Sequence, residues 1–174
     1  LKQTNNMKEQ INTIIISLVM LTAVVGALIW FGNSGNKPEP AAVGGLFGGV
    51  LTAEETAFDF GSVPINGGLV NHEFTLENLS DTMVKIGEVS TSCMCTTALV
   101  TVGNKTYGPF GMPGHLSASK ANAIVNSGEK VIVKAIFDPA AHGPAGIGEV
   151  QRQIFLNTGV AEPIVLNFKA IVTP

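Results

Sequence analysis

Residues 69–79 read LVNHEFTLENL, and this stretch decides the fold class. Val70, His72, Phe74 and Leu76 occupy every second position, and the positions between them hold Asn, Glu, Thr and Glu. Successive side chains of a β-strand point to opposite faces. The alternation therefore predicts an antiparallel strand with one face buried and the other in water.

Six further stretches after residue 52 show short strand patterns between turn residues: 56–63, 83–89, 91–102, 130–137, 150–156 and 164–172. No helical periodicity of useful length occurs in this part of the chain. We therefore expect an all-β, Ig-like β-sandwich of about seven strands over residues 52–174. Residues 103–125 (GNKTYGPFGMPGHLSASKANAIV) interrupt this rhythm and predict a long loop.

A single transmembrane helix is expected to precede the sandwich. Residues 11–31 (INTIIISLVMLTAVVGALIWF) contain no charge and provide the roughly 20 apolar residues that span a bilayer. A cleaved signal peptide is the alternative, but the run is long and ends without a small-x-small site. Residues 1–10 would be a cytoplasmic N-terminus, because lysines are more numerous before the run than shortly after it. The Gly/Pro-rich residues 32–51 would be a linker, and the sandwich would be extracytoplasmic on the cell membrane.

Charge and motif content exclude several classes of function. The net charge is −3 and no basic cluster is present, so nucleic-acid binding has no electrostatic support. Two cysteines in one Cys-x-Cys motif do not form the disulfide framework of a small secreted scaffold. No nucleophile signature or phosphate loop is found, so we do not expect an enzyme.

The chemically suggestive residues are Cys93 and Cys95. In an extended strand, residues two apart project from the same face with Cα atoms about 6.5–7 Å apart, so two thiolates could share a soft metal ion. Met94 would then point to the opposite face. In the long segment, the sequence GPFGMPGH (108–115) restricts the backbone at its prolines and could present Met112 and His115 as supplementary ligands. Copper or zinc would suit this ligand set.

Other interpretations of these residues stay open. The cysteines could simply pack or form a structural disulfide, or they could act as a redox dithiol. His72 shares the phase of Phe74 and is expected at the edge of the core, hydrogen-bonded to backbone. His142 is as consistent with a turn residue as with a ligand.

Several strings resemble the bacterial domain of unknown function 1573 family. They are FDFGSVP at 58–64, VNHEFTLEN at 70–78, TSCMCTTA at 91–98, SGEK at 127–130, and FDP at 137–139 with the Gly-Pro that follows at 143–144. They occur in the expected order over roughly residues 56–172. The resemblance implies an Ig-like module related to the major-sperm-protein and ASH type, often exported. The long Gly/Pro segment and His142 depart from its usual pattern.

Together these features lead to one hypothesis and one alternative. The hypothesis is a membrane-anchored, extracytoplasmic Ig-like binding module that binds copper or zinc through Cys93, Cys95, Met112 and His115. The alternative is a non-enzymatic scaffold or adhesion-type module that recruits a protein or envelope partner, its cysteines being structural or redox-active.

Overall fold

A computed structural model describes Met20, Thr22 and residues 49–115, 119–160 and 162–174. The chain divides into two units, Leu1–Val43 and Gly44–Pro174. In the first, Met20 and Thr22 are helical; the remainder of the predicted anchor at 11–31 lies outside the described residues, as does the N-terminus at 1–10. Within the part of the chain that the structure describes, no helix has the length and apolar character needed to span a membrane.

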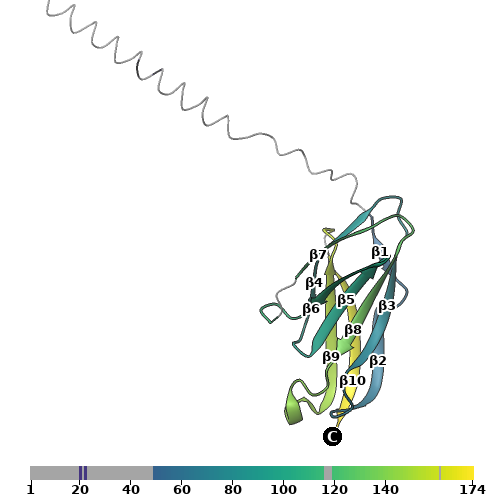
Figure 1. The fold of residues 1–174 in the computed structure, drawn as a ribbon, viewed down its shortest axis with the longest axis vertical. Helices are drawn as coiled ribbons and strands as arrows, with labels where there is room; N and C mark the ends of the chain where they lie inside the picture. The colour runs from purple at the N-terminus through teal and green to yellow at the C-terminus, as the bar shows by residue number, and fades with distance from the viewer. Residues whose placement is uncertain (1–19, 21, 23–48, 116–118, 161) are drawn as a thin grey trace, which may run out of the picture. The chain divides into compact units, whose positions relative to one another are not determined.

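The second unit consists of two five-stranded sheets (Figure 1). The strands of the first, in spatial order, are β1 (Leu51–Ala53), β3 (Val70–Asn78), β8 (Lys130–Phe137), β5 (Thr96–Val102) and β6 (Lys105–Phe110). Those of the second are β2 (Ala57–Pro64), β10 (Ile164–Thr173), β9 (Gly148–Asn157), β4 (Val84–Thr91) and β7 (Lys120–Val125). All pairs are antiparallel except β2 with β10, and a short 3-10 helix, η1 (Gly143–Gly146), precedes β9.

Alternating side chains from both sheets form one hydrophobic core. On β3, Phe74 and Leu76 are fully buried, as the alternation of residues 69–79 predicts. Phe137 on β8 lies 5.5 Å, centroid to centroid, from Phe168 on β10, so aromatic rings join the two sheets. Each such buried ring contributes roughly 1.5–3 kcal/mol through the area it removes from water. The predicted all-β, two-layered architecture is confirmed.

The predicted number of strands was too low. The structure describes ten strands where the sequence indicated about seven, and residues 103–125 contain β6 and β7 rather than one long loop. β6 buries little besides Phe110, and β7 buries Ala121, Ala123 and Val125, whose small side chains give a weak alternation signal. The strand expected over residues 91–102 is shorter than predicted, because β5 begins only at Thr96.

The sandwich also starts slightly earlier than expected. Leu51, assigned by its sequence to the end of the linker, is buried and pairs with Asn78 as the first residue of β1. Gly49 is buried as well, and a Cβ at this position would collide with Ser80 and Thr82. Residues 32–48 of the predicted linker lie outside the described residues.

Candidate metal and dithiol site

The two cysteines lie in the turn that crosses from β4 in one sheet to β5 in the other. The buried hydroxyl of Thr91 sets this turn by donating to the carbonyls of Cys93 and Thr96, each at 3.0 Å. The backbone N–H of Thr96 also donates to the carbonyl of Cys93 at 3.1 Å. The Cα atoms of Cys93 and Cys95 are consequently 5.3 Å apart. The expectation of an extended strand here was wrong, because the turn, and not a strand face, brings the sulfurs together.

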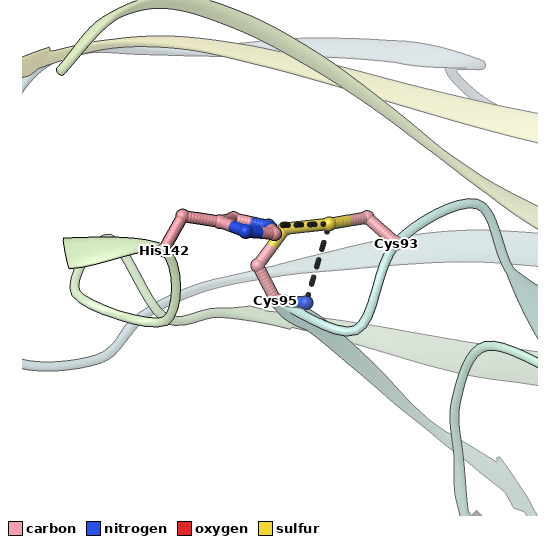
Figure 2. Close-up of side chains that lie close together, drawn as sticks. All are labelled: Cys93, Cys95 and His142. Carbon is pink, nitrogen blue, oxygen red and sulfur yellow. Dashed lines mark hydrogen bonds between the residues drawn. A yellow bond between two sulfur atoms is a disulfide. The ribbon is translucent and has the colours of Figure 1, made fainter. Parts of the chain in front are cut away.

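The sulfur atoms of Cys93 and Cys95 are at disulfide-bonding distance (Figure 2). Their surroundings differ, since Cys95 is 2% exposed and Cys93 is only partly buried. Met94 between them is half exposed at the surface of the turn. A disulfide that closes a three-residue loop restricts the unfolded chain by only about 1.6 kcal/mol in the chain-entropy treatment, against about 3 kcal/mol for a 15-residue loop. A disulfide between Cys93 and Cys95 would therefore add little to the stability of the fold.

His142 completes a group of three side chains. Its Nε2 lies 3.1 Å from the Sγ of Cys93, and Figure 2 shows the imidazole directed toward that sulfur. The ligand atoms of Cys93, Cys95 and His142 all lie within 4.8 Å of one another. Two sulfurs and one imidazole nitrogen form a donor set for soft or borderline metal ions.

The pairing of β5 with β8 explains why His142 reaches the cysteines. These strands are antiparallel, with Thr96 opposite Phe137, so the turn after β8 lies beside the turn before β5. The N–H of Asp138 donates to the carbonyl of Cys95 at 2.9 Å and ties the two turns together. The Asp138 side chain accepts from the N–H of Ala140 at 2.9 Å, which shapes the segment that leads to His142.

Arg152 on β9 contacts the buried sulfur. Its Nε donates to the Sγ of Cys95 at 3.1 Å, and its Nη1 donates to the carbonyl of Gln151 at 2.8 Å. Val150 and Ile154, in the same phase of β9, are buried, so Arg152 occupies an inward-facing position of a core strand. Burial accordingly lowers the pKa of the Arg152 guanidinium. Among the described residues, no carboxylate forms an ion pair with it.

A cleft of about 410 Å³ opens beside the group. It lies between the turn that contains His142 and strand β9, and both His142 and Arg152 line it. A second, larger cleft of about 720 Å³ extends from Ser92 and Arg152 over β9 and β10 to Phe58 on β2. Arg152 lines both clefts, and Ser92, the residue before Cys93, lines the larger one.

The supplementary ligands expected from sequence follow β6, which pairs with β5 on the side away from β8. Met112 is partly buried and His115 is exposed, and the N–H of His115 donates to the carbonyl of Met112 at 3.0 Å. The carbonyl of Gly111 accepts from the N–H of Thr91 at 3.2 Å, so this segment follows the strand end that leads into the turn. The third ligand atom of the close group nevertheless comes from His142 and not from His115. A metal-binding role for Met112 and His115 stays a prediction.

His72 lies at the edge of the core, as expected, but its partner differs. Its ring stacks on Phe58 with 3.6 Å between ring centroids and packs edge-on against Phe74. Its Nε2 contacts the carboxylate of Glu55 and not a backbone group. These contacts account for His72 as a packing residue.

Comparison with known proteins gives a family match and a similar crystal structure. A family model described as protein of unknown function (DUF1573) matches residues 51–108, which confirms the resemblance seen in the sequence. A crystal structure of a protein of unknown function from Porphyromonas gingivalis W83 superposes with a TM-score of 0.53 at 16% identity, covering 79% of this chain and 51% of that one. The chain thus spans about half the length of that protein, and the likeness shows the fold alone.

Two proteases of Vibrio cholerae are more distant. The VesB protease superposes with a TM-score of 0.46 at 14% identity over 70% of this chain and 32% of that one. The serine protease VesC gives 0.45 at 13% identity, over 71% and 24%. No curated protein matches the chain.

Proposed function

We propose that this chain, whose residues 51–108 match the DUF1573 family, is an extracytoplasmic Ig-like module that binds Cu(I) in preference to Zn(II). The ligands are the reduced thiols of Cys93 and Cys95 together with the imidazole of His142. The observation that carries the proposal is the convergence of these three ligand atoms within 4.8 Å from two separate turns.

The geometry needs only a small adjustment to accept a metal ion. In a trigonal site of three ligands, metal–sulfur bonds of about 2.3 Å and metal–nitrogen bonds of about 2.0–2.1 Å place ligand atoms roughly 3.8–4.0 Å apart. The Nε2 of His142 and the Sγ of Cys93 are 3.1 Å apart and would have to separate by about 0.7 Å. Reduction of the cysteine pair frees the two sulfurs to move apart on the same turn. A metal ion and a disulfide are therefore alternative occupants of this site.

The charge of Arg152 favours the monovalent ion. Two thiolates with Cu(I) carry a charge of −1, which the guanidinium against Cys95 neutralises. Two thiolates with Zn(II) are neutral, so the same guanidinium leaves a net positive charge in a partly buried place, which is unfavourable. Zn(II) also prefers four ligands, whereas the close group offers three. Met112 and His115 are candidates for additional ligands.

The setting of the site is part of the proposal. Residues 11–31 would hold the module at the outer face of the cell membrane. Expression of the full chain and of a variant lacking residues 1–31, followed by alkaline extraction of membranes, tests the anchor. The full chain should stay with the membrane and the truncated chain should be released; equal release of both would contradict the anchor.

A competition titration tests metal binding. The full chain, purified in mild detergent and reduced without oxygen, is titrated with Cu(I) and, separately, with Zn(II) against a chromophoric chelator. We expect one Cu(I) per chain, and at least a tenfold loss of affinity in Cys93→Ser, Cys95→Ser and His142→Ala. The matched control is His72→Gln, because His72 contacts Glu55 and Phe58 and lies outside the close group. Unchanged affinity in the His142 variant would reject the proposed ligand set.

A further inference from the structure

We propose that the Cys93–Cys95 pair also exchanges with dithiol substrates, with Cys93 as the sulfur that is attacked and Cys95 as the sulfur that leaves. The substrate class is a pair of neighbouring thiols, in a small dithiol or in an exposed Cys pair of a polypeptide. This activity belongs to the metal-free, oxidised protein. It is therefore independent of metal binding by the reduced form.

The difference in exposure selects the attacked sulfur. Cys95 is 2% exposed, while Cys93 is only partly buried and contacts His142, which lines the cleft of about 410 Å³. Exchange requires a thiolate to approach one sulfur of a disulfide, and access helps to decide which one it reaches. An incoming thiolate reaches the Sγ of Cys93 and not that of Cys95.

The hydrogen-bond donors are placed to stabilise the leaving sulfur. When the substrate thiolate bonds to the Sγ of Cys93, the bond between the two protein sulfurs breaks and its electron pair moves to Cys95. The Nε–H of Arg152, 3.1 Å from this sulfur, faces the negative charge that develops there. The hydroxyl of Thr96 lies 3.7 Å from the same sulfur and is a second, weaker partner. Hydrogen-bond donors aimed at a developing charge lower the barrier of such a step.

The second step returns Cys93 to the thiolate. The remaining substrate thiolate attacks the substrate sulfur bound to Cys93, the mixed disulfide breaks, and its electron pair moves to the Sγ of Cys93. The backbone N–H of Cys95 donates to that sulfur at 3.3 Å. The substrate loses two electrons and releases two protons to solvent, and the protein disulfide gains two electrons. The protein thiolates then take up protons from solvent, so atoms and electrons balance.

Mapping the mixed disulfide on the unaltered protein tests this polarity. The oxidised full chain, in detergent with chelators for Cu(I) and Zn(II), is mixed with excess glutathione and quenched in acid. The free thiols are then alkylated, and the modified peptides are identified by mass spectrometry. We expect glutathione on Cys93 and the alkyl group on Cys95. Glutathione on Cys95, an even distribution, or a disulfide that is not reduced would each overturn the proposal.

Reduction kinetics test the role of Arg152. The rate at which dithiothreitol reduces the pair should fall at least tenfold in Arg152→Gln and recover in part in Arg152→Lys, which restores the cation. Lys169→Gln is the matched control, because Lys169 lines the larger cleft but pairs with Asp59. Circular dichroism confirms that each variant is folded. Equal rates in folded Arg152→Gln and the unaltered chain would show that the guanidinium does not stabilise the leaving sulfur. The glutathione map needs no variant, so it decides the polarity even if an Arg152 variant fails to fold.

Discussion

The Nε of Arg152 lies 3.1 Å from the Sγ of Cys95 and donates a hydrogen bond to it. This contact joins β9 of one sheet to the turn that enters β5 of the other. An arginine in the inward phase of a core strand is costly unless it has a partner, because burial disfavours its charge. The sulfur supplies that partner, and the contact gives Arg152 a chemical reason to occupy an otherwise apolar position.

Replacing Arg152 by Leu should separate metal binding from folding. Leu is apolar, offers no ligand atom to a metal ion and suits a position whose neighbours in phase, Val150 and Ile154, are buried. Because a well-packed apolar replacement of a buried charge is often neutral or stabilising, we expect the melting temperature of the oxidised protein to be unchanged or raised. Cu(I) affinity should fall at least tenfold, while Zn(II) affinity stays the same or rises. Equal losses for the two metals would contradict the charge argument.

Thr91→Val should loosen the cysteine turn. The substitution preserves the shape of the side chain but removes the hydroxyl that donates to the carbonyls of Cys93 and Thr96. We expect a loss of about 1–2 kcal/mol in the free energy of unfolding, because these carbonyls lose a buried donor. Affinity for Cu(I) should fall at the same time. Thr106→Val is the matched control, since Thr106 is exposed and its hydroxyl bonds to the side chain of the partly buried Thr101; a control that lost as much would argue against a specific effect.

Asn78→Ala should be among the most destabilising substitutions of a polar residue. Asn78 is fully buried, and its amide donates to the carbonyls of Thr82, Val125 and Asn126 at 2.8–3.1 Å. Removing the amide leaves buried carbonyls without a donor, and we expect a loss of about 2–3 kcal/mol by chemical denaturation. The exposed Asn104 provides the control, with a change within about 0.5 kcal/mol. A loss below 1 kcal/mol for Asn78→Ala would show that the surrounding turn rearranges.

Asp59 should contribute a pH-dependent part of the stability. The N–H of Gly61 donates to its carboxylate at 2.8 Å and Lys169 pairs with it at 3.2 Å; chiefly through the first contact, the pKa of Asp59 is lowered. A carboxyl group whose pKa is lower in the folded state stabilises the fold above its ordinary value of about 3.9. That contribution is lost as the pH falls through the folded value. The free energy of unfolding should be measured by chemical denaturation from pH 7 to pH 2. At pH 7 it should be smaller for Asp59→Asn than for the unaltered chain, and the two values should converge in acid.

Asp81→Asn, on an exposed turn, is the control for this titration. It should follow the unaltered chain over the whole pH range. A constant difference between Asp59→Asn and the unaltered chain, undiminished in acid, would show that the carboxylate acts through packing and not through its charge.

Part of the site was predictable from the sequence, and the unknown pairing of the strands set the limit. The Cys-x-Cys motif predicted the two sulfur atoms of the close group, since no other residues of the chain offer thiols. The sequence did not decide whether His142 is a turn residue or a ligand, because its approach to Cys93 depends on which strand pairs with β5. The same uncertainty applied to Met112 and His115, which follow β6, the neighbour of β5 on its other side. The turn after a strand lies beside the turn before its antiparallel neighbour. This rule would have pointed to His142 if the sequence had shown that β8 is the neighbour of β5.

The alternation of apolar side chains by itself determined that the chain forms half-buried strands, because a period of two leaves no other regular structure that buries one face. The residue types at 93 and 95 also predicted where a soft metal ion could bind, because thiolates are the ligands that such ions prefer. Only the tertiary structure decided the order of the strands, since many orders bury the same faces. That order places β8 beside β5 and β9 beside β4, and so delivers His142 and Arg152 to the two sulfurs.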